Sequence, residues 1–182
     1  MKKFASILVL SLFISTICNT VAAQNMSGDS IKAQMLRDWQ RAKSYTADYL
    51  KTMPADQYAK HPIDSIRSFS EQMLHTASGI FGHVSIGTGQ PRLFLGFNME
   101  KSPTAQSKDS VSYYVNASYD FAINAITALD PNKFGEMAKR GNASFTRYTW
   151  MLKAFEHQTH HRGQCTIYIR LLGIKPPNEQ LY

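Results

Sequence analysis

The sequence predicts an all-α protein, a four-helix bundle with long loops between its helices. Apolar residues recur at the 3.6-residue spacing of a helix in four segments, a proline or glycine follows each segment, and sustained strand alternation is absent. Four amphipathic helices in one chain of this size pack naturally as a bundle. The predicted helices cover about residues 30–53, 64–86, 110–129 and 144–172. A short extended piece is expected at 92–97, inside the second loop.

The first two helices are bounded by capping residues and helix breakers. Asp29 or Ser30 is the expected N-cap of the first helix, and Pro54 ends it because the residue before a proline avoids helical conformation. The second helix is expected to begin at about Asp64 and to end at the glycine-containing sequence 87–89.

The last two helices have similar boundaries. Asp109 is the expected N-cap of the third helix, and Asp130-Pro131 stops it. Asn142 or Ser144 is expected to start the fourth helix, and Gly173 to end it.

Residues 1–23 have the features of a cleaved signal peptide. Lys2 and Lys3 precede an apolar run at 4–17 that is too short to span a bilayer, and small residues at 21–23 suit signal peptidase. We therefore expect a mature domain at 24–182, exported to a periplasm or the exterior and soluble after cleavage. The alternative is a lipoprotein anchored through Cys18, which the bulky residue before it disfavours.

Composition excludes several classes of protein. The chain of 182 residues is 43% apolar and 18% charged, which is ordinary for a globular core. Removal of Lys2 and Lys3 with the signal peptide lowers the net charge from +7 to +5. No block of basic residues is present, so we expect no nucleic-acid partner. Cys165 is the one cysteine of the mature chain, which excludes an internal disulfide.

A pair of histidines on the fourth predicted helix is the first candidate site. His157 and His161 are spaced i, i+4, so they lie together on one face of the helix and can hold one metal ion. His160 lies about 100° around the helix from His161, so we do not expect it to be a ligand. The pair lies on the stripe expected to face the core: Trp150, Ala154, His157, His161, Gln164, Tyr168 and Leu171. The alternative is a pair of core histidines bonded to backbone or polar side chains.

A third ligand would have to come from another segment. His61 lies in a loop, whereas His75 and His83 lie on the second predicted helix. His75 lies opposite the apolar side of that helix, among serines and glycines. Either this is a solvated face, or the small residues leave a cavity between helices.

These residues carry a resemblance to a family. The sequence His157-x-x-x-His161-Arg162-Gly163-Gln164 resembles the C-terminal helix of the DinB/YfiT-like proteins, and the segment 69–75 resembles their second helix. The resemblance implies a four-helix bundle whose divalent metal is held by His75, His157 and His161. It also implies possible homodimers and an activity as a metal-dependent hydrolase or a thiol-dependent transferase.

The implied site has a defined chemistry. Three neutral imidazoles leave the metal its full charge and an open position for a small-molecule substrate or water, as in catalytic sites. Zinc or nickel is expected first, with iron or manganese as alternatives. Glu71 is the candidate general base, although a solvated helix carboxylate is the simpler interpretation. Gln164 is the candidate for a residue that contacts a metal ligand without binding the metal itself. Cys165 is either a soft fourth ligand or a small buried hydrophobic residue.

Three hypotheses therefore remain open from the sequence: a metal-dependent enzyme, a metal- or ligand-binding bundle without turnover, and a structural bundle with vestigial histidines. Export disfavours a thiol-dependent reaction, because an oxidising compartment lacks an evident supply of reduced thiol. If three neutral histidines bind the metal, its affinity should fall below about pH 6.

Overall fold

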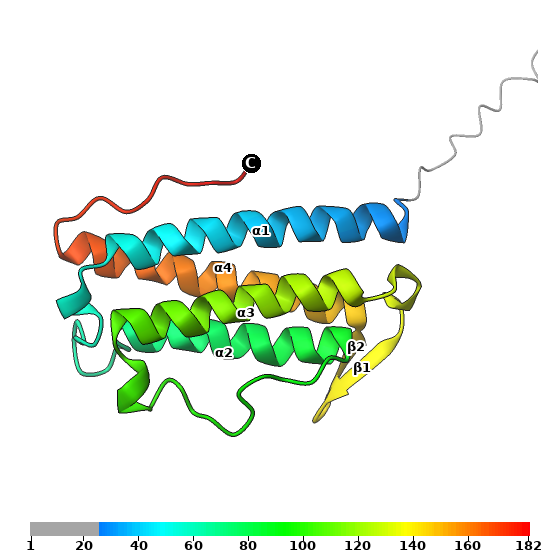
Figure 1. The fold of residues 1–182 in the computed structure, drawn as a ribbon, viewed down its shortest axis with the longest axis horizontal. Helices are drawn as coiled ribbons and strands as arrows, with labels where there is room; N and C mark the ends of the chain where they lie inside the picture. Colours follow the sequence, from blue (N-terminus) through cyan, green and yellow to red (C-terminus); the bar gives the residue numbers. More distant parts are fainter. Residues whose placement is uncertain (1–25) are drawn as a thin grey trace, which may run out of the picture.

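A computed structural model of the chain describes residues 26–182 and confirms the predicted four-helix bundle (Figure 1). The helices are α1 (Gly28–Thr52), α2 (Phe69–Thr88), α3 (Lys108–Ala128) and α4 (Arg147–Leu171). A two-stranded hairpin, β1 (Met137–Arg140) and β2 (Ala143–Thr146), precedes α4. None of these helices is both long enough and apolar enough to cross a membrane. The predicted signal peptide at 1–23, with Cys18, lies outside the described residues.

The order of the helices explains the unequal loops. Figure 1 shows α2 and α3 running in the same direction, with α4 antiparallel to α2. A connection between parallel neighbours must return along the whole length of the bundle. The loop 89–107 makes this return, whereas the hairpin lies at the end of the bundle where α3 passes to α4.

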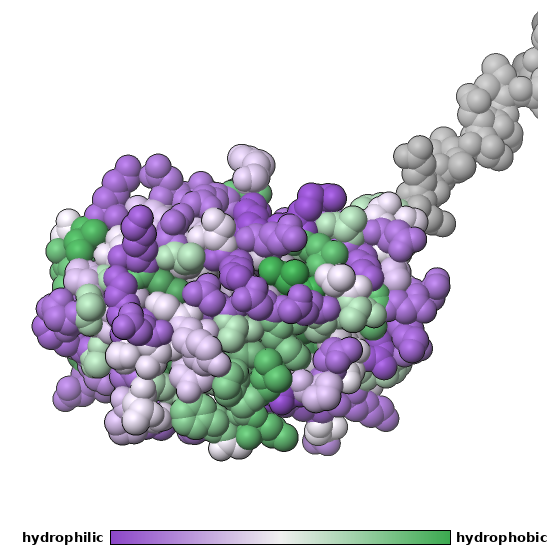
Figure 2. Space-filling model, viewed as in Figure 1, coloured by the Kyte–Doolittle hydropathy of each residue, from purple (hydrophilic) through white to green (hydrophobic). Residues whose placement is uncertain are grey.

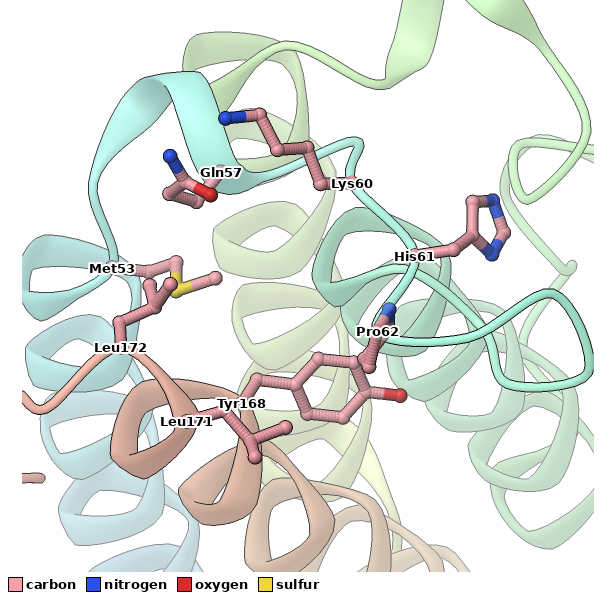
Figure 3. A pocket seen from close by; sticks show the side chains of 8 residues that line it. All are labelled: Met53, Gln57, Lys60, His61, Pro62, Tyr168, Leu171 and Leu172. Atoms are coloured by element: carbon pink, nitrogen blue, oxygen red, sulfur yellow. The ribbon is translucent and has the colours of Figure 1, made fainter.

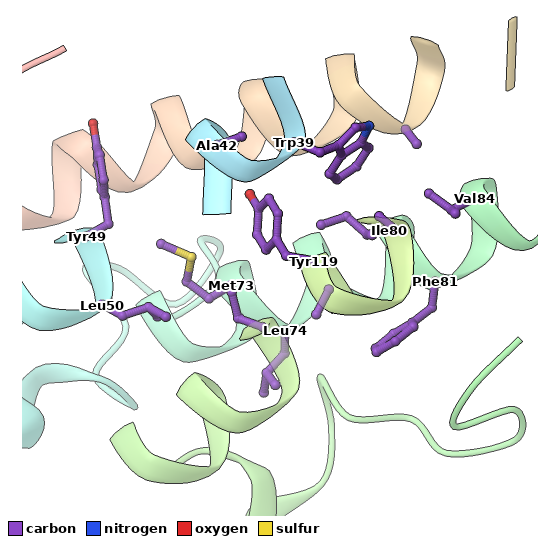
Figure 4. Close-up of a cluster of buried hydrophobic side chains, with 14 of the residues drawn as sticks. Trp39, Ala42, Tyr49, Leu50, Met73, Leu74, Ile80, Phe81, Val84 and Tyr119 are labelled. Carbon is purple, nitrogen blue, oxygen red and sulfur yellow. The ribbon is translucent and has the colours of Figure 1, made fainter. Parts of the chain in front are cut away.

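The core is built from side chains of all four helices. Figure 4 labels members from α1, α2 and α3. Trp39 of α1 packs edge to face against Tyr119 of α3, with ring centroids 5.7 Å apart. The Tyr119 hydroxyl is buried but hydrogen-bonded, 2.7 Å from Oγ1 of Thr46 and 2.8 Å from Oε1 of Gln158. Such pairing removes most of the cost of burying polar groups. Arg162 also donates to Gln158 and lies 4.5 Å over the ring of Tyr45.

The helix N-termini are displaced from the predicted ones. Ser27 caps α1 and Ser107 caps α3, each by accepting the backbone N–H of the third residue after it. Asp29 and Asp109, two of the residues expected as caps, lie in the first turns instead. A serine can satisfy the free N–H groups while the following aspartate interacts with the helix dipole, which makes this arrangement favourable.

The second helix begins at Phe69 and not at about residue 64. Ser68 and Glu71 form a capping box, in which each side chain accepts the backbone N–H of the other residue. This reciprocal pairing fixes the start of the helix. Residues 64–67 consequently belong to the loop.

The hairpin at 137–146 was not predicted, and it moves the start of α4 to Arg147 with Thr146 as its cap. The predicted starts at Asn142 or Ser144 are therefore wrong. Gly141 and Asn142 form the two-residue turn, and Gly141 has a φ of 56°, a conformation that favours glycine. Two strands of four residues are too short to show an alternating pattern.

The extended piece expected at 92–97 is also absent, because residues 93–96 form turns. Phe94 has a φ of 55°, and its ring packs 5.3 Å from that of Phe81 in the core. This contact pulls Phe94 inward and leaves Leu93, Leu95 and Phe97 exposed. Apolar surface accordingly appears in Figure 2 at the lower edge of the view, where Figure 1 draws this loop.

The buried face of α4 differs in part from the predicted stripe. Gln164 and Leu171 are exposed, whereas Met151, Gln158 and Cys165 are fully buried. The histidine pair therefore lies at the edge of the buried face and not at its centre. A site at that edge is shielded from bulk water and still within reach of a ligand.

Candidate metal centre

The three histidines named from the sequence meet in the folded chain. His75 comes from α2, and His157 and His161 come from α4. One nitrogen from each ring forms a group in which all three lie within 4.8 Å of one another, a group that could hold a metal ion. His161 is buried, and the other two rings are half-buried. The coordinating face therefore points between α2 and α4.

A glycine makes this meeting possible. A Cβ at Gly79 would lie 2.1 Å from Cε1 and 2.5 Å from Nδ1 of His157, far closer than non-bonded atoms approach. Any other residue at 79 would push the ring away. Gly79 therefore lets the ring of His157 from α4 pack against the side of α2 that carries His75, so this side of α2 is not simply a solvated face.

His75 is held by a carboxylate from the long loop. Its Nδ1 lies 2.7 Å from Oε1 of Glu100, and the other carboxylate oxygen accepts from Nε of Arg67 at 3.3 Å. A carboxylate on one ring nitrogen orients a histidine and makes the other nitrogen a better metal ligand. Sequence reasoning missed Glu100, because nothing local to residues 89–107 indicates where that loop folds.

His161 is held by two glutamines. Its Nδ1 lies 3.0 Å from Oε1 of Gln164 and 2.7 Å from Nε2 of Gln72, and Gln72 also donates to Gln164. Nε2 of His161 is available to a metal when Nδ1 carries the proton and donates it to Oε1 of Gln164, in which case Nε2 of Gln72 donates to Gln164 and not to the ring. Gln164 thus contacts a candidate ligand, the position expected for it from the sequence, and Gln72 is an additional residue that only the fold reveals.

Both histidines of α4 are in the form that binds metal. Burial lowers the pKa of His157 to about 3, and the neighbouring histidines lower it further by charge repulsion. Burial and the proximity of His75 likewise lower the pKa of His161 to about 4. Both rings are therefore neutral at pH 7. Nδ1 of His157 is buried without a hydrogen-bond partner among the described residues.

The other titratable candidates lie outside this group. His83 is adjacent, with its ring 5.4 Å from that of His157 and its Nδ1 bonded to the Gly79 carbonyl. His160 is exposed and contacts Gln164. His61 bonds through Nδ1 to the carbonyl of Ile66 in the preceding loop.

The remaining two sequence candidates also have defined surroundings. The Glu71 carboxylate completes the capping box and pairs with Lys101 at 3.1 Å. Burial opposes its ionisation, but these hydrogen bonds outweigh burial and lower the pKa of Glu71. Cys165 is fully buried in the core, and burial raises the pKa of its thiol. The candidate ligand group of the described residues does not include it.

Two hollows lie near the end of the bundle where α2 begins and α4 ends. One of about 600 Å³ is bordered by Gln72 and Gln164, the two residues that contact His161, together with Arg67 and Tyr168. A smaller one of about 180 Å³ lies between the ends of α1 and α4 (Figure 3). His61 lines the smaller hollow, and none of the three grouped histidines lines either one. The larger hollow is the nearer of the two to the candidate metal centre, because Gln72 and Gln164 both border it and contact His161.

The arrangement agrees with comparisons to known proteins. A family model described as the DinB family matches residues 24–181. The chain belongs to the DinB family.

Three solved structures, two of them of proteins described as DinB-like, share the fold at low identity. One from Bacillus cereus ATCC 10987 has a TM-score of 0.69 at 17% identity, covering 81% of this chain and 97% of its own. One from Bacillus subtilis has a TM-score of 0.65 at 16% identity, with the same coverage. A conserved protein from Enterococcus faecalis has a TM-score of 0.66 at 18% identity, covering 82% of this chain and 99% of its own. None of the curated proteins matches the sequence.

Proposed function

We propose that this DinB-family protein binds one divalent transition metal ion through His75, His157 and His161 and uses it for catalysis on a small molecule. The observation that carries the proposal is the convergence of three ring nitrogens, within 4.8 Å of one another, from two helices. Hydrolysis is the favoured reaction, and transfer to a low-molecular-weight thiol is the other activity that family resemblance implies.

The residues fit a metal of this kind. Three imidazole nitrogens bound to one zinc ion at about 2.1 Å lie about 3.4 Å apart, so modest ring rotations would bring this group to coordination distance. The Glu100 carboxylate contacts Nδ1 of His75, and metal-bound histidines generally have such a hydrogen-bond partner on the nitrogen that does not bind the metal. The unpartnered Nδ1 of His157 is a buried polar atom of the kind that a bound cation satisfies.

The chain itself supplies the positioning of the ligands. Bound at three neutral ligands, the metal would supply Lewis-acid activation of water or of a substrate oxygen. Gln72 and Gln164 contact the ring of His161 and also border the hollow of about 600 Å³. Zinc or nickel is the metal proposed first, because imidazole ligands suit both.

The second candidate is a metal-binding protein without turnover, and the carboxylates favour it. Glu71 is engaged by the helix N-terminus and Lys101, and Glu100 is engaged by His75 and Arg67. A hydrolase needs a base within reach of the attacking water. Neither carboxylate is free for that role in this arrangement.

Metal content tests the proposal. Residues 24–182 would be exported, purified without chelator or histidine tag and analysed by mass spectrometry. We expect about one equivalent of transition metal, lost in the variant His157→Ala/His161→Ala and retained in the matched variant His160→Ala. Metal-free wild-type protein, even after reconstitution with zinc or nickel, would refute the site. Bound metal with no turnover of esters, amides or thiol-transfer substrates would favour the second candidate.

We also propose that the protein is exported. The basic, apolar and small-residue regions of 1–23 support cleavage before residue 24, and the family match begins at that residue. Mass determination of the protein secreted from a bacterial host would give a chain starting at Gln24. Retention of the intact N-terminus in the cytoplasmic fraction would contradict export.

A further inference from the structure

Two arginines converge beside the candidate metal centre without a carboxylate between them. A Cβ at Gly82 of α2 would lie 3.6 Å from Nη1 of Arg140 and 3.9 Å from Nη1 of Arg92. The two guanidinium groups therefore point to the same spot above the helix. Arg140 comes from the end of β1 and Arg92 from the loop after α2, so only the folded chain brings them together.

This cluster of positive charge is not neutralised within residues 26–182. No ion pair of that part of the chain involves Arg92, Arg140 or the nearby Lys153. Nη2 of Arg92 donates to the hydroxyl of Ser78 at 3.0 Å, but its Nε is buried without a partner. Arg140 is exposed, whereas the unpaired buried donor of Arg92 is costly. An anion within reach of both guanidinium groups would supply a partner for the charge of each.

The cluster lies one helical turn from the histidines. Gly79, which faces His157, and Gly82, which faces the two arginines, are spaced i, i+3 on the same face of α2. His83 lies between the two regions, with its ring 5.4 Å from that of His157. Burial lowers the pKa of His83, and the three neighbouring positive charges lower it further.

The hairpin that carries Arg140 is packed against α4. Nε1 of Trp150 donates to the carbonyl of Ala138 at 2.9 Å, and the Trp150 ring packs 5.4 Å from that of Phe145. Both partners belong to the two strands of the hairpin. The hairpin that carries Arg140 is thus fixed against the same helix that carries His157.

We propose that Arg92 and Arg140 form an oxyanion-binding subsite, so that the protein acts on small molecules that carry a carboxylate or phosphate group about one helical turn from the reacting centre. Arginine pairs are well suited to these groups because their planar forks donate two parallel hydrogen bonds. That a reaction takes place at the histidines rests on the proposed function, whereas anion binding by the two arginines can be measured without metal.

Anion binding would be followed by ¹H–¹⁵N NMR on residues 24–182, metal-free and zinc-loaded, at constant ionic strength. The probes are benzoate, phenyl phosphate and the neutral analogue benzamide. We expect one or both anions to shift the amide signals of Gly79 and Gly82 and the indole signal of Trp150, and benzamide to leave them unchanged. The stronger anion identifies whether carboxylates or phosphates are the natural class.

Matched variants decide the assignment. Arg92→Gln and Arg140→Gln should each weaken anion binding about 10-fold or more, as expected for loss of a charge-assisted hydrogen bond. Arg170→Gln removes the same charge from an exposed position near the end of α4 and should have no effect. Equal binding of benzamide and benzoate, unchanged affinity in both arginine variants, or no shift at millimolar anion would overturn the subsite.

The two proposals fail separately in this experiment. Protein that binds neither zinc nor nickel but binds benzoate through Arg92 and Arg140 would refute the metal site and retain the subsite. Protein that binds zinc but neither anion would do the reverse.

Discussion

Replacing Gly79 with alanine should abolish metal binding while leaving the fold intact. The new Cβ would lie 2.1 Å from Cε1 of His157. Ordinary non-bonded carbon contacts start at about 3.4 Å, so the ring must move by about 1.3 Å. Metal–ligand distances tolerate only about 0.2 Å. The displaced ring therefore leaves the coordination sphere, and we expect metal affinity to fall at least about 100-fold.

The effect of this substitution on stability should be small, which separates it from unfolding. Alanine stabilises a helix interior by up to about 1 kcal/mol relative to glycine. Displacement of a packed ring costs typically about 1–3 kcal/mol. The metal-free Gly79→Ala variant should therefore lose between about 0 and 2 kcal/mol of unfolding free energy. Urea denaturation measures that change, and competition with a chelator measures metal affinity.

The matched control is Gly82→Ala, three residues further along the same helix. Its Cβ would meet only two guanidinium nitrogens, at the ordinary distances of 3.6 and 3.9 Å. It should gain the helix stabilisation and keep wild-type metal affinity. In a His157→Ala background the clash at 79 disappears, so Gly79→Ala should there stabilise the protein as Gly82→Ala does. Wild-type metal affinity in Gly79→Ala would refute the assignment of His157 as a ligand.

Three further predictions concern the contact between Glu100 and His75, the apolar core, and the dependence of stability on pH. Glu100→Gln should weaken metal binding about 10- to 100-fold through His75, without changing the melting temperature of the metal-free protein by more than a few degrees; unchanged affinity in a chelator competition would contradict this role. Leu74→Ala should cost about 2–5 kcal/mol in urea denaturation, because the side chain is fully buried; a cost below about 1 kcal/mol would contradict the packing described. Metal-free protein should lose stability as pH falls below the ordinary histidine value of 6.5, by at most about 1.4 kcal/mol per pH unit for each of His157 and His161. The sign follows because both folded pKa values lie below 6.5, so the unfolded chain binds more protons in this window. Urea midpoints measured between pH 7 and pH 5 check this, and the variant His157→Ala/His161→Ala should show a flatter dependence.

The lowered pKa values also revise one expectation drawn from the sequence. Ordinary histidines would lose a metal to protons below about pH 6. Burial, together with charge repulsion from neighbouring basic groups, lowers the pKa of His157 to about 3 and that of His161 to about 4. Competition by protons at these two rings therefore begins at more acidic pH than the sequence alone suggested.

Local information determined most of the helical architecture. Helical periodicity depends on neighbours three and four residues apart, and the breakers Pro54, Pro131 and Gly173 act on adjacent residues. The spacing of His157 and His161 on one helix is local in the same way. For that reason the four helices and the histidine pair were predicted correctly, with the caps of α1 and α3 only two residues away from those expected.

The errors lie where two local signals compete or where elements are short. Serine and aspartate both favour helix N-termini, so Ser107 and Asp109 could not be ranked from composition alone. The hairpin at 137–146 has strands of four residues, which periodicity cannot distinguish from a loop or from the start of a helix. The start of α2 was predicted too early because the capping box that fixes it is a reciprocal contact between Ser68 and Glu71, which single-residue preferences do not show.

The sequence by itself determined which residues could form the site: two histidines on one helix, a third on another, and glutamine, serine and glycine around them. Only the tertiary structure decided that they meet. Gly79 makes room for a ring from α4, and Glu100 reaches His75 from a loop that crosses the bundle. Such contacts depend on how helices pack and where a long loop returns, and these are properties of the whole chain that no local spacing encodes.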